Sequence, residues 1–474
     1  MELYREQDIQ AITNNMNRIL EETTAIKNAK SEPTLSEFKS TMIIIRQFIK
    51  DKKRIIYGGD AFNTLVKHKD PKDIIYTEQC RNDIEFYTPD PIQDTVDLCN
   101  ILHKADFKYV EGVQAQHDMT YSIFVNFVNM CDMTYMPKNV FSNMPVIEID
   151  GLEYSDPTWM MVDVLRQYND PMLSYQRVKD KIFDRSMRLF KNYPLKLNTK
   201  EHFTYTEKND NKRKELFEHI VSMSTILFTG SIAKTYYSTL KTEIDFTALE
   251  VFSTDFEKDV ITINEKLKTI FGNKYQRLSV TYYCKFFQFW DERLEFMIDD
   301  EHIITIYGPN DYCIPYNNMF IKNGKFTNIQ TKNVNKQKNT DDDSCIKIVT
   351  FMVLFNHILI HRQFEYINKT EEYKKYENEM HILLTKREDF LKQENKNVLD
   401  NTPYREFVTE CSGTFIDSRR KARLIMKNKR EKGKYTMFRY NAKTQIDSYT
   451  APDFKFSNIS GKANDNGKKK LLKN

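Results

Sequence analysis

The sequence has no apolar run long enough to span a membrane, no closely spaced pair of cysteines and no large excess of charge. Its longest apolar run, near residues 348–355, is soon interrupted by Asn356 and His357, well short of the roughly 20 residues that a bilayer requires. The opening segment, MELYREQDIQ, is charged from its second residue onward. We therefore expect neither a membrane span nor a signal peptide.

The cysteines and the charge balance narrow the class of protein further. Seven cysteines are scattered between Cys80 and Cys411 without a CxxC pair, which argues against a disulfide framework or a zinc ribbon and favours a reducing compartment. The net charge is only +4, so attraction to nucleic acid has to come from local basic patches.

What is present is enough apolar material for more than one core. Hydrophobic residues make up 40% of the chain and aromatic residues 13%, against 29% charged residues, which excludes a mainly disordered protein. Because 474 residues exceed what one core usually organises, we predict two domains, at residues 1–195 and 196–455. The basic tail at 456–474 is predicted to be disordered.

The first half alternates helical and strand patterns around a glycine turn. Apolar spacing predicts a helix over 35–52, and a strand-like run at 54–57 then ends in Gly58-Gly59. Further helices are expected near 61–67, 94–104 and 159–193, with strands at 83–87 and 121–135, the latter as one long strand or a hairpin. This order predicts an α+β or α/β fold.

The second half echoes this order. A strand-like segment, Ile226 to Thr229, runs into Gly230-Ser231 and a helical segment, and the acidic segment Glu243-Ile244-Asp245-Phe246 follows. Such a repeat suggests an internal duplication. No third acid stands at a later strand, so we expect the second copy to be non-catalytic.

The Gly58-Gly59 turn suits a phosphate ligand. Glycine lacks Cβ and lets the backbone approach a ligand closely, and the helix that follows presents free N–H groups at its N-terminus. A pair of glycines at such a turn is also compatible with a simple tight connection. The phosphate interpretation therefore depends on carboxylates nearby.

Three acids supply a candidate metal site. Asp83 and Glu85 are two positions apart on a predicted strand, so both side chains face the same side and can bind Mg²⁺ or Mn²⁺ through oxygen. Asp132, in the later strand segment, is the candidate third ligand of a two-metal site. Taken singly, each acid also fits a solvated strand edge or turn.

These segments resemble a known family. The runs YGGDAFN, NDIEFYTPDP and CDMTYMPKNVF look like the nucleotidyltransferase core of poly(A) polymerases from large cytoplasmic DNA viruses of the poxvirus, asfarvirus and mimivirus types. The resemblance extends through residues 160–181 and, more weakly, 410–435. It implies tandem nucleotidyltransferase-fold domains of α+β class, with a catalytic first domain, a non-catalytic second one and helical connecting elements.

Two departures from the commoner nucleotidyltransferase pattern stand in the site. The acidic pair is Asp-x-Glu, which moves one carboxylate by a methylene, and the turn is Gly-Gly rather than Gly-Ser. The carboxylates remain, so activity is still expected, with Gly58 and Gly59 holding the triphosphate through backbone amides alone.

Basic residues suggest where RNA and nucleotide bind. From Ser418 to Lys434 nine Lys or Arg stand against one Glu, followed by Tyr435, Phe438 and Tyr440, an arrangement that suits phosphate contacts and base stacking but also a solvated helix. Arg177 and Lys181 could face the triphosphate or solvent. The predicted RNA contacts are Arg419, Arg420, Arg423, Lys427 and Arg430.

His357 and His361 have the i, i+4 spacing of zinc ligands. No glutamate or third ligand accompanies them along the predicted apolar helix, so the sequence favours core or interface histidines over a metal site.

The resemblance implies a specific reaction. It is the Mg²⁺- or Mn²⁺-assisted addition of AMP from ATP to an RNA 3′ end, with Asp83, Glu85 and Asp132 as catalytic metal ligands. A homodimer in the host cytoplasm or the virion is also implied. The alternatives are a transferase for another nucleotide or acceptor, and a non-catalytic RNA-binding scaffold derived from such an enzyme.

Overall fold

The computed structural model describes most of the chain, and all structural statements below concern the described residues. These are 3–31, 33–76, 82–115, 117, 119–172, 174–197, 211–239, 244, 246, 248–308, 313–322, 325–327, 344–416, 418–431 and 438–442.

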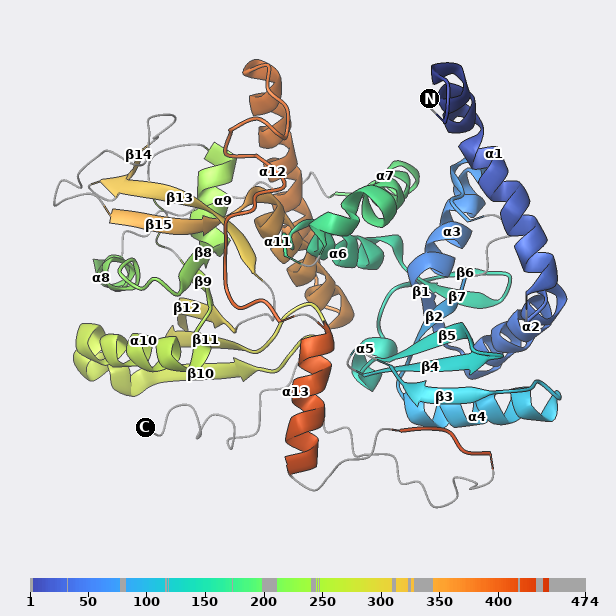
Figure 1. Cartoon of the computed structure of the whole chain (residues 1–474). Coiled ribbons are helices and arrows are strands. Elements are labelled where there is room, and N and C mark those ends of the chain that lie inside the picture. The colour runs from blue at the N-terminus through green and yellow to red at the C-terminus, as the bar shows by residue number, and fades with distance from the viewer. Residues whose placement is uncertain are drawn as a thin grey trace. The chain divides into compact units, whose positions relative to one another are not determined.

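The chain divides into two compact units (Figure 1), which we describe separately. Unit 1 is built from described residues of 1–136, 146–156 and 421–454, and unit 2 from those of 137–145, 157–420 and 455–474. The segment 157–192, assigned to the first domain from sequence, thus packs within unit 2. The boundary at residue 195 stays a prediction, because the chain passes between the two units more than once and no single point separates them.

Unit 1 is a seven-stranded mixed sheet with helices. Its strands lie in the order β3-β4-β5-β2-β1-β7-β6. The elements are α1 Glu6–Lys30, α2 Leu35–Lys52, β1 Ile55–Tyr57, α3 Gly58–Lys69, β2 Ile84–Thr88, α4 Pro91–Lys104, β3 Glu111–Gln114, β4 Thr120–Val125, β5 Val128–Tyr135, β6 Val146–Ile149 and β7 Leu152–Ser155. A 3-10 turn, Pro71–Asp73, follows α3.

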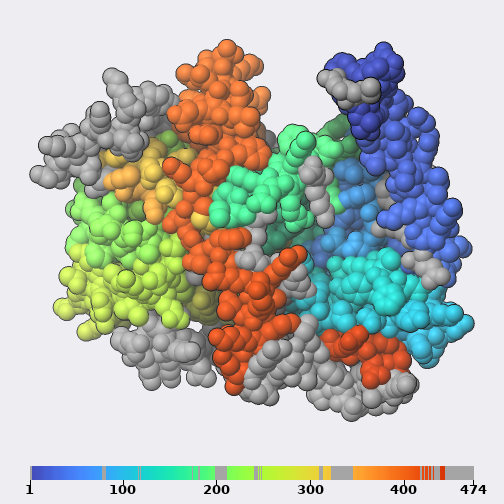
Figure 2. Space-filling view, in the orientation of Figure 1, coloured from blue at the N-terminus to red at the C-terminus, as the bar shows by residue number. Residues whose placement is uncertain are grey.

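Local sequence signals account for these elements. Helix α2 begins with a capping box in which Thr34 accepts from the backbone N–H of Glu37, and it ends at Lys53 in the left-handed conformation. Helix α4 begins with Pro91, whose missing N–H is not needed there. Helix α1 has no buried side chain and lies on the surface, dark blue in Figure 2.

Unit 2 contains the larger sheet, in the order β10-β11-β12-β9-β8-β15-β13-β14, with β16 paired to β13. Its strands are β8 Ile226–Thr229, β9 Leu249–Ser253, β10 Leu278–Tyr283, β11 Arg293–Ile298, β12 Glu301–Tyr307, β13 Ile314–Lys322, β14 Lys325–Thr327, β15 Ser344–Val349 and β16 Cys411–Ser412.

The helices of unit 2 include α11, most of whose side chains are buried. They are α5 Lys138–Phe141, α6 Pro157–Tyr168, α7 Phe183–Asn192, α8 Asn211–Ile220, α9 Gly230–Thr239, α10 Phe256–Phe271, α11 Phe351–Ile367 and α12 Tyr373–Gln393, with 3-10 turns at Tyr175–Arg177 and Gly272–Arg277 and a π-helical turn at Val178–Ile182. Helix α13, Ser418–Glu431, spans the boundary between the ranges of the two units.

The two sheets repeat one topology. Strands β3-β4-β5-β2-β1-β7-β6 match β10-β11-β12-β9-β8-β15-β13 in order, and each neighbouring pair has the same parallel or antiparallel sense in both sheets. The predicted tandem α+β architecture is therefore confirmed, and the internal duplication is visible in the strand connections.

A side-chain motif is repeated along with the topology. In unit 1, Thr88 at the end of β2 donates to Asp94 over 2.5 Å, and in unit 2 Ser253 at the end of β9 donates to Asp259 over 2.5 Å. In both units the same hydroxyl also accepts from the backbone N–H two residues later. Each hydroxyl therefore ties a strand end to the first turn of the next helix.

The apolar helix predicted to carry His357 and His361 is confirmed as Phe351–Ile367, and residues 344–349 before it form strand β15. One sequence-based expectation differs from the structure. The scattered cysteines argued against disulfides, yet Cys313 and Cys411 are bonded, because the pairing of β13 with β16 brings together residues 98 positions apart.

Candidate active site

Glu85 and Asp132 lie side by side on neighbouring strands. They are direct partners in the parallel ladder of β2 and β5, and Asp83 stands two residues before Glu85, just ahead of β2. Since side chains two apart on a strand share a face, all three carboxylates belong to one side of the sheet. The structure thus brings together the three acids singled out in the sequence.

Two neutral side chains position this acidic group. Asn129 donates its side-chain amide to Asp83 Oδ2 and to Asp132 Oδ1, both over 3.2 Å. Ser122, on β4, donates to the same oxygen of Asp132 over 2.5 Å. Asn129 therefore bridges the carboxylate just ahead of β2 and the one on β5.

The glycine turn lies against Glu85. The backbone N–H of Gly59 donates to Glu85 Oε2 over 2.9 Å, at the start of α3. Gly58 has φ +68°, and a Cβ there would lie 1.7 Å from the same oxygen. This position therefore needs glycine both for its backbone conformation and for the close approach of Glu85.

The position of Glu85 bears on metal binding. Its carboxylate accepts from the turn and shares one face of the sheet with Asp83 and Asp132. Carboxylate oxygens are the ligands that Mg²⁺ and Mn²⁺ prefer, so the donor set on this face fits such ions.

Buried groups beside the acids have shifted pKa values. Burial raises the pKa of Tyr57 well above its usual value, and the charge of Glu85 raises it further. Burial, followed by the charge of Asp132, likewise raises the pKa of Cys131. Tyr57 therefore stays protonated, and its hydroxyl is hydrogen-bonded to Thr134 over 2.8 Å.

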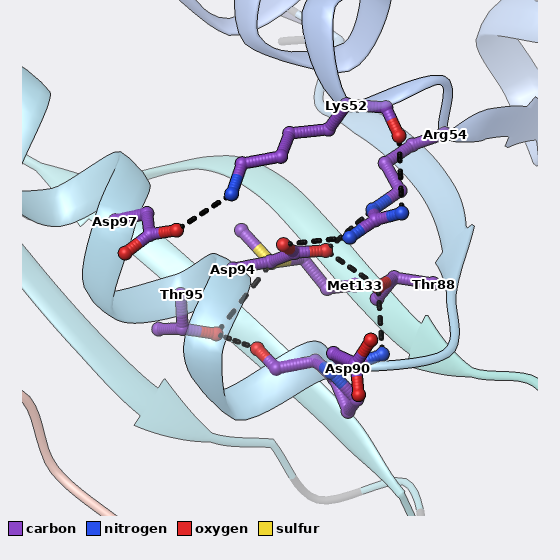
Figure 3. A network of polar contacts seen from close by, with 9 residues as sticks. Lys52, Arg54, Thr88, Asp90, Asp94, Thr95, Asp97 and Met133 are labelled. Carbon is purple, nitrogen blue, oxygen red and sulfur yellow. Dashed lines mark hydrogen bonds and ion pairs between the residues drawn. The ribbon is translucent and has the colours of Figure 1, made fainter.

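On the other face of β2, a buried polar network holds the strand in place (Figure 3). Both oxygens of Asp94 accept from Arg54, over 2.7 and 3.0 Å, while Thr88 also donates to this carboxylate. Asp97, one turn further along α4, pairs with Lys52 at 2.8 Å nearer the surface. The network anchors β2 between α4 and the end of α2.

Asn129 and Ser122 were not identified from the sequence. Their roles depend on the antiparallel pairing of β4 with β5, in which Ser122 is the partner of Asp132. The residues 121–135, predicted as one strand or a hairpin, form this hairpin. The only sequence signal for Asn129 is its position three residues before Asp132, and this spacing is too common to predict a functional residue.

The other predicted nucleotide and RNA contacts stay predictions. Arg177 is exposed in a 3-10 turn, and the side chain of Lys181 lies outside the described part of the structure. Helix α13 carries exposed Arg419, Arg420, Arg423 and Lys427 at the molecular surface, red in Figure 2, whereas the side chain of Arg430 is not among those described.

The expected base-stacking aromatics are used differently. Phe438 and Tyr440 are each only 8% exposed. Phe438 packs edge-on against Tyr121, and Tyr440 donates to Asn100 while its backbone pairs with Gly112 beside β3. The stacking hypothesis is wrong for these two rings, because they complete the core of unit 1; Tyr435 lies outside the described residues.

The second sheet has an acid at only one of the three equivalent positions. The register partner of Thr229, the residue before Gly230, is Glu250, just as Glu85 is the partner of Tyr57 before Gly58. Two residues earlier stands Ala248, and the parallel neighbour of Glu250 is Thr305. The strand of unit 2 that corresponds to β2 is therefore β9, Leu249–Ser253. The sequence suggested Glu243 and Asp245 for this strand, and both lie outside the described residues.

Comparison with known proteins agrees with this geometry. The family model described as "Poly(A) polymerase catalytic subunit" matches residues 43–174, and the model described as "APMV, Putative poly(A) polymerase, catalytic subunit, C-terminal" matches residues 190–474. A protein of Acanthamoeba polyphaga mimivirus, named "Putative poly(A) polymerase catalytic subunit", is 34% identical over 466 residues, covering 92% of this chain and 78% of the relative. The chain belongs to the viral poly(A) polymerase catalytic subunit family.

Other members of the family show the same relationship. A like-named protein of African swine fever virus is 32% identical over 130 residues, 27% of each chain. The crystal structure of the Megavirus polyadenylate synthase superposes with a TM-score of 0.82 at 28% identity, covering 97% of this chain and 92% of that one. The viral poly(A) polymerase fold therefore extends over both units.

Membership defines the class of reaction. A poly(A) polymerase is a polynucleotide adenylyltransferase, which implies ATP as substrate, RNA as acceptor and a divalent metal. Within the described residues, no helix is both long enough and apolar enough to cross a membrane.

Proposed function

We propose that this poly(A) polymerase transfers AMP from ATP to an RNA 3′-hydroxyl at a two-metal site formed by Asp83, Glu85 and Asp132. The observation that carries the proposal is the register pairing of Glu85 with Asp132, with Asp83 tied to Asp132 through Asn129. This places three hard oxygen donors on one face beside a helix N-terminus.

Asp83 and Glu85 would hold both divalent ions, and Asp132 would hold the one that serves the hydroxyl. Bound there, the ions would supply activation of the attacking hydroxyl and neutralisation of the leaving pyrophosphate. Ser122 and Asn129 fix the position of Asp132 through its Oδ1.

The glycine turn has a role in binding the triphosphate. The N-terminus of α3 offers backbone N–H groups and the positive end of the helix dipole to an anion. Glu85 now accepts from Gly59 there. A triphosphate oxygen that replaces Glu85 at this N–H would release the carboxylate toward Asp132, so nucleotide binding and metal binding would assist each other.

Unit 2 is proposed to support the reaction without catalysing it. Glu250 alone remains at the three equivalent positions, since Ala248 and Thr305 offer no carboxylate. The exposed arginines of α13 are proposed to contact RNA phosphates. A homodimer in the host cytoplasm or the virion remains an expectation from the family resemblance.

Primer extension tests the reaction. The full chain is incubated with an unstructured RNA, each NTP separately, and Mg²⁺ or Mn²⁺, alongside Asp83→Asn, Asp132→Asn and the matched control Asp97→Asn. We expect extension with ATP that falls on the order of 10²-fold or more in the first two variants, and unchanged activity in the control.

The alternatives have distinct outcomes. Equal extension with another NTP would favour a different nucleotide specificity. RNA binding without extension under any condition would favour the scaffold function and contradict the proposed catalysis.

RNA contact by α13 has its own measurement. The triple substitution of Arg419, Arg420 and Arg423 by Ala is expected to weaken RNA binding and reduce the slope of log K against log salt by about 2. Substitution of Arg18, an exposed arginine of α1 paired with Glu22, serves as the control. An unchanged slope would remove α13 from the RNA path.

A further inference from the structure

A group of three possible metal ligands, two buried and one partly buried, lies in unit 2, outside the proposed active site. Within the described residues, Glu250, His357 and His361 are the group of three His, Cys, Asp or Glu side chains whose ligand atoms converge, all within 4.8 Å of one another. Glu250 comes from β9, and the two histidines stand one turn apart on α11.

The distances within this group suit tetrahedral coordination. His357 Nε2 and His361 Nε2 are 3.2 Å apart, and Glu250 Oε2 is 3.8 Å from His357 Nε2. Two nitrogen ligands bound to one zinc ion at the usual bond length lie about 3.3 Å apart, so the two imidazoles already have the spacing of a coordinated pair.

We propose that Glu250, His357 and His361 form a structural site for a first-row transition ion, of which Zn²⁺ is the best match. Two imidazoles and one carboxylate suit zinc better than magnesium, which prefers oxygen alone. The site is distinct from the Mg²⁺ or Mn²⁺ site of unit 1, although Glu250 holds the position that Glu85 holds there.

The surroundings shield the two histidines from water, since His357 and His361 are 3% and 8% exposed. Burial lowers the pKa of both imidazoles. For Glu250, burial raises the pKa, but the hydrogen bond with His357 and the charge of Lys234 lower it below its usual value.

Neighbouring groups can support the ion from outside. Tyr307 Oη lies 2.9 Å from His361 Nε2 and 3.3 Å from Glu250 Oε2. An ion bound to His361 Nε2 would take the place of the hydrogen bond between Tyr307 and His361. The hydrogen bond from Tyr307 to Glu250 would remain and would orient this ligand. Lys234 is paired with Glu379 at 3.1 Å, which reduces repulsion of a cation by this ammonium.

Zinc binding to the full-length protein tests the inference. After removal of metal with a chelator, the protein is incubated with Zn²⁺, desalted and measured for zinc by mass spectrometry. We expect one zinc ion per chain in the wild type and an affinity reduced at least about tenfold in His357→Gln and His361→Gln. His302→Gln, a histidine of β12 bonded to Thr305, is the matched control and should retain the ion.

Two further measurements separate this inference from catalysis and from misfolding. Asp132→Asn should lose RNA extension but keep the zinc, so the two proposals can fail independently. Should a histidine variant not fold, Co²⁺ added to the wild type decides, because a tetrahedral nitrogen and oxygen site gives visible absorption bands. Absence of these bands, or equal zinc in the wild type and the folded double histidine variant, would overturn the site.

Discussion

Glu85 and Glu250 occupy the same position in the two sheets. Each is the antiparallel partner of the residue before a glycine turn, Tyr57 in one sheet and Thr229 in the other, and each comes within 2.5 Å of where a Cβ on the glycine would lie. Their neighbours differ, because Glu85 has Asp132 beside it and Glu250 has Thr305. The same backbone position therefore serves different chemistry in the two sheets.

Alanine at position 58 should abolish adenylyl transfer. The new Cβ would displace the Glu85 carboxylate, and the left-handed backbone adds about 1 kcal/mol of strain. Primer extension and thermal melting of Gly58→Ala measure the two effects. Gly272→Ala is the control, since Gly272 also has positive φ but has nothing within 4 Å of its Cβ position; it should lose stability only.

Removal of the Asn129 amide should impair catalysis by releasing Asp83 and Asp132 from their common donor. Asn129→Ala is expected to reduce the extension rate on the order of tenfold and to raise the Mg²⁺ concentration needed for half-maximal rate. A titration of rate against Mg²⁺ gives both values. Asn143→Ala, which removes a bond to the backbone of Asn139, should change neither.

The two acids of α4 should contribute unequally to stability. Asp94 is 1% exposed and bonded to Arg54 and Thr88, so Asp94→Ala is expected to lower the free energy of unfolding by about 3 kcal/mol. Asp97 pairs with Lys52 at the surface, and Asp97→Ala should cost less than about 1 kcal/mol. Equal losses in denaturant unfolding would contradict the importance given to the buried network.

The disulfide should be detectable and stabilising. Peptide mapping without reductant is expected to recover Cys313 linked to Cys411. Since the bond joins residues 98 positions apart, Cys313→Ser should lower stability by roughly 2–4 kcal/mol, while Cys284→Ser leaves it unchanged. Recovery of both thiols in free form would contradict the pairing.

Much of unit 1 could be predicted because its signals are local. The helix at 35–52, the strand before Gly58 and the Asp-x-Glu strand depend on patterns within a few residues, and α2, β1 and β2 confirm them. Asp132 could be identified as the third acid only because its motif follows the other two in the order typical of a known family. Asn129 could not be found, because only the hairpin of β4 and β5 brings it to Asp83.

The second half was less predictable because its acidic pattern has been interrupted. Ala248 stands where unit 1 has Asp83, so Glu250 is not part of a pair of acids two residues apart. Glu243 and Asp245 do form such a pair, and the sequence therefore favours them as the acidic strand. Along the sequence, the histidines of α11 have no third ligand close by. That ligand is Glu250, more than a hundred residues earlier, which only the packing of α11 on the sheet brings close.

The paired hydroxyl and carboxylate at the strand ends, Thr88 with Asp94 and Ser253 with Asp259, recur in the two units. Both copies of the fold keep this tether, whereas only Glu250 stands at the three positions that Asp83, Glu85 and Asp132 occupy in unit 1. The tether therefore belongs to the framework that both units share, and the complete set of acids belongs to unit 1 alone.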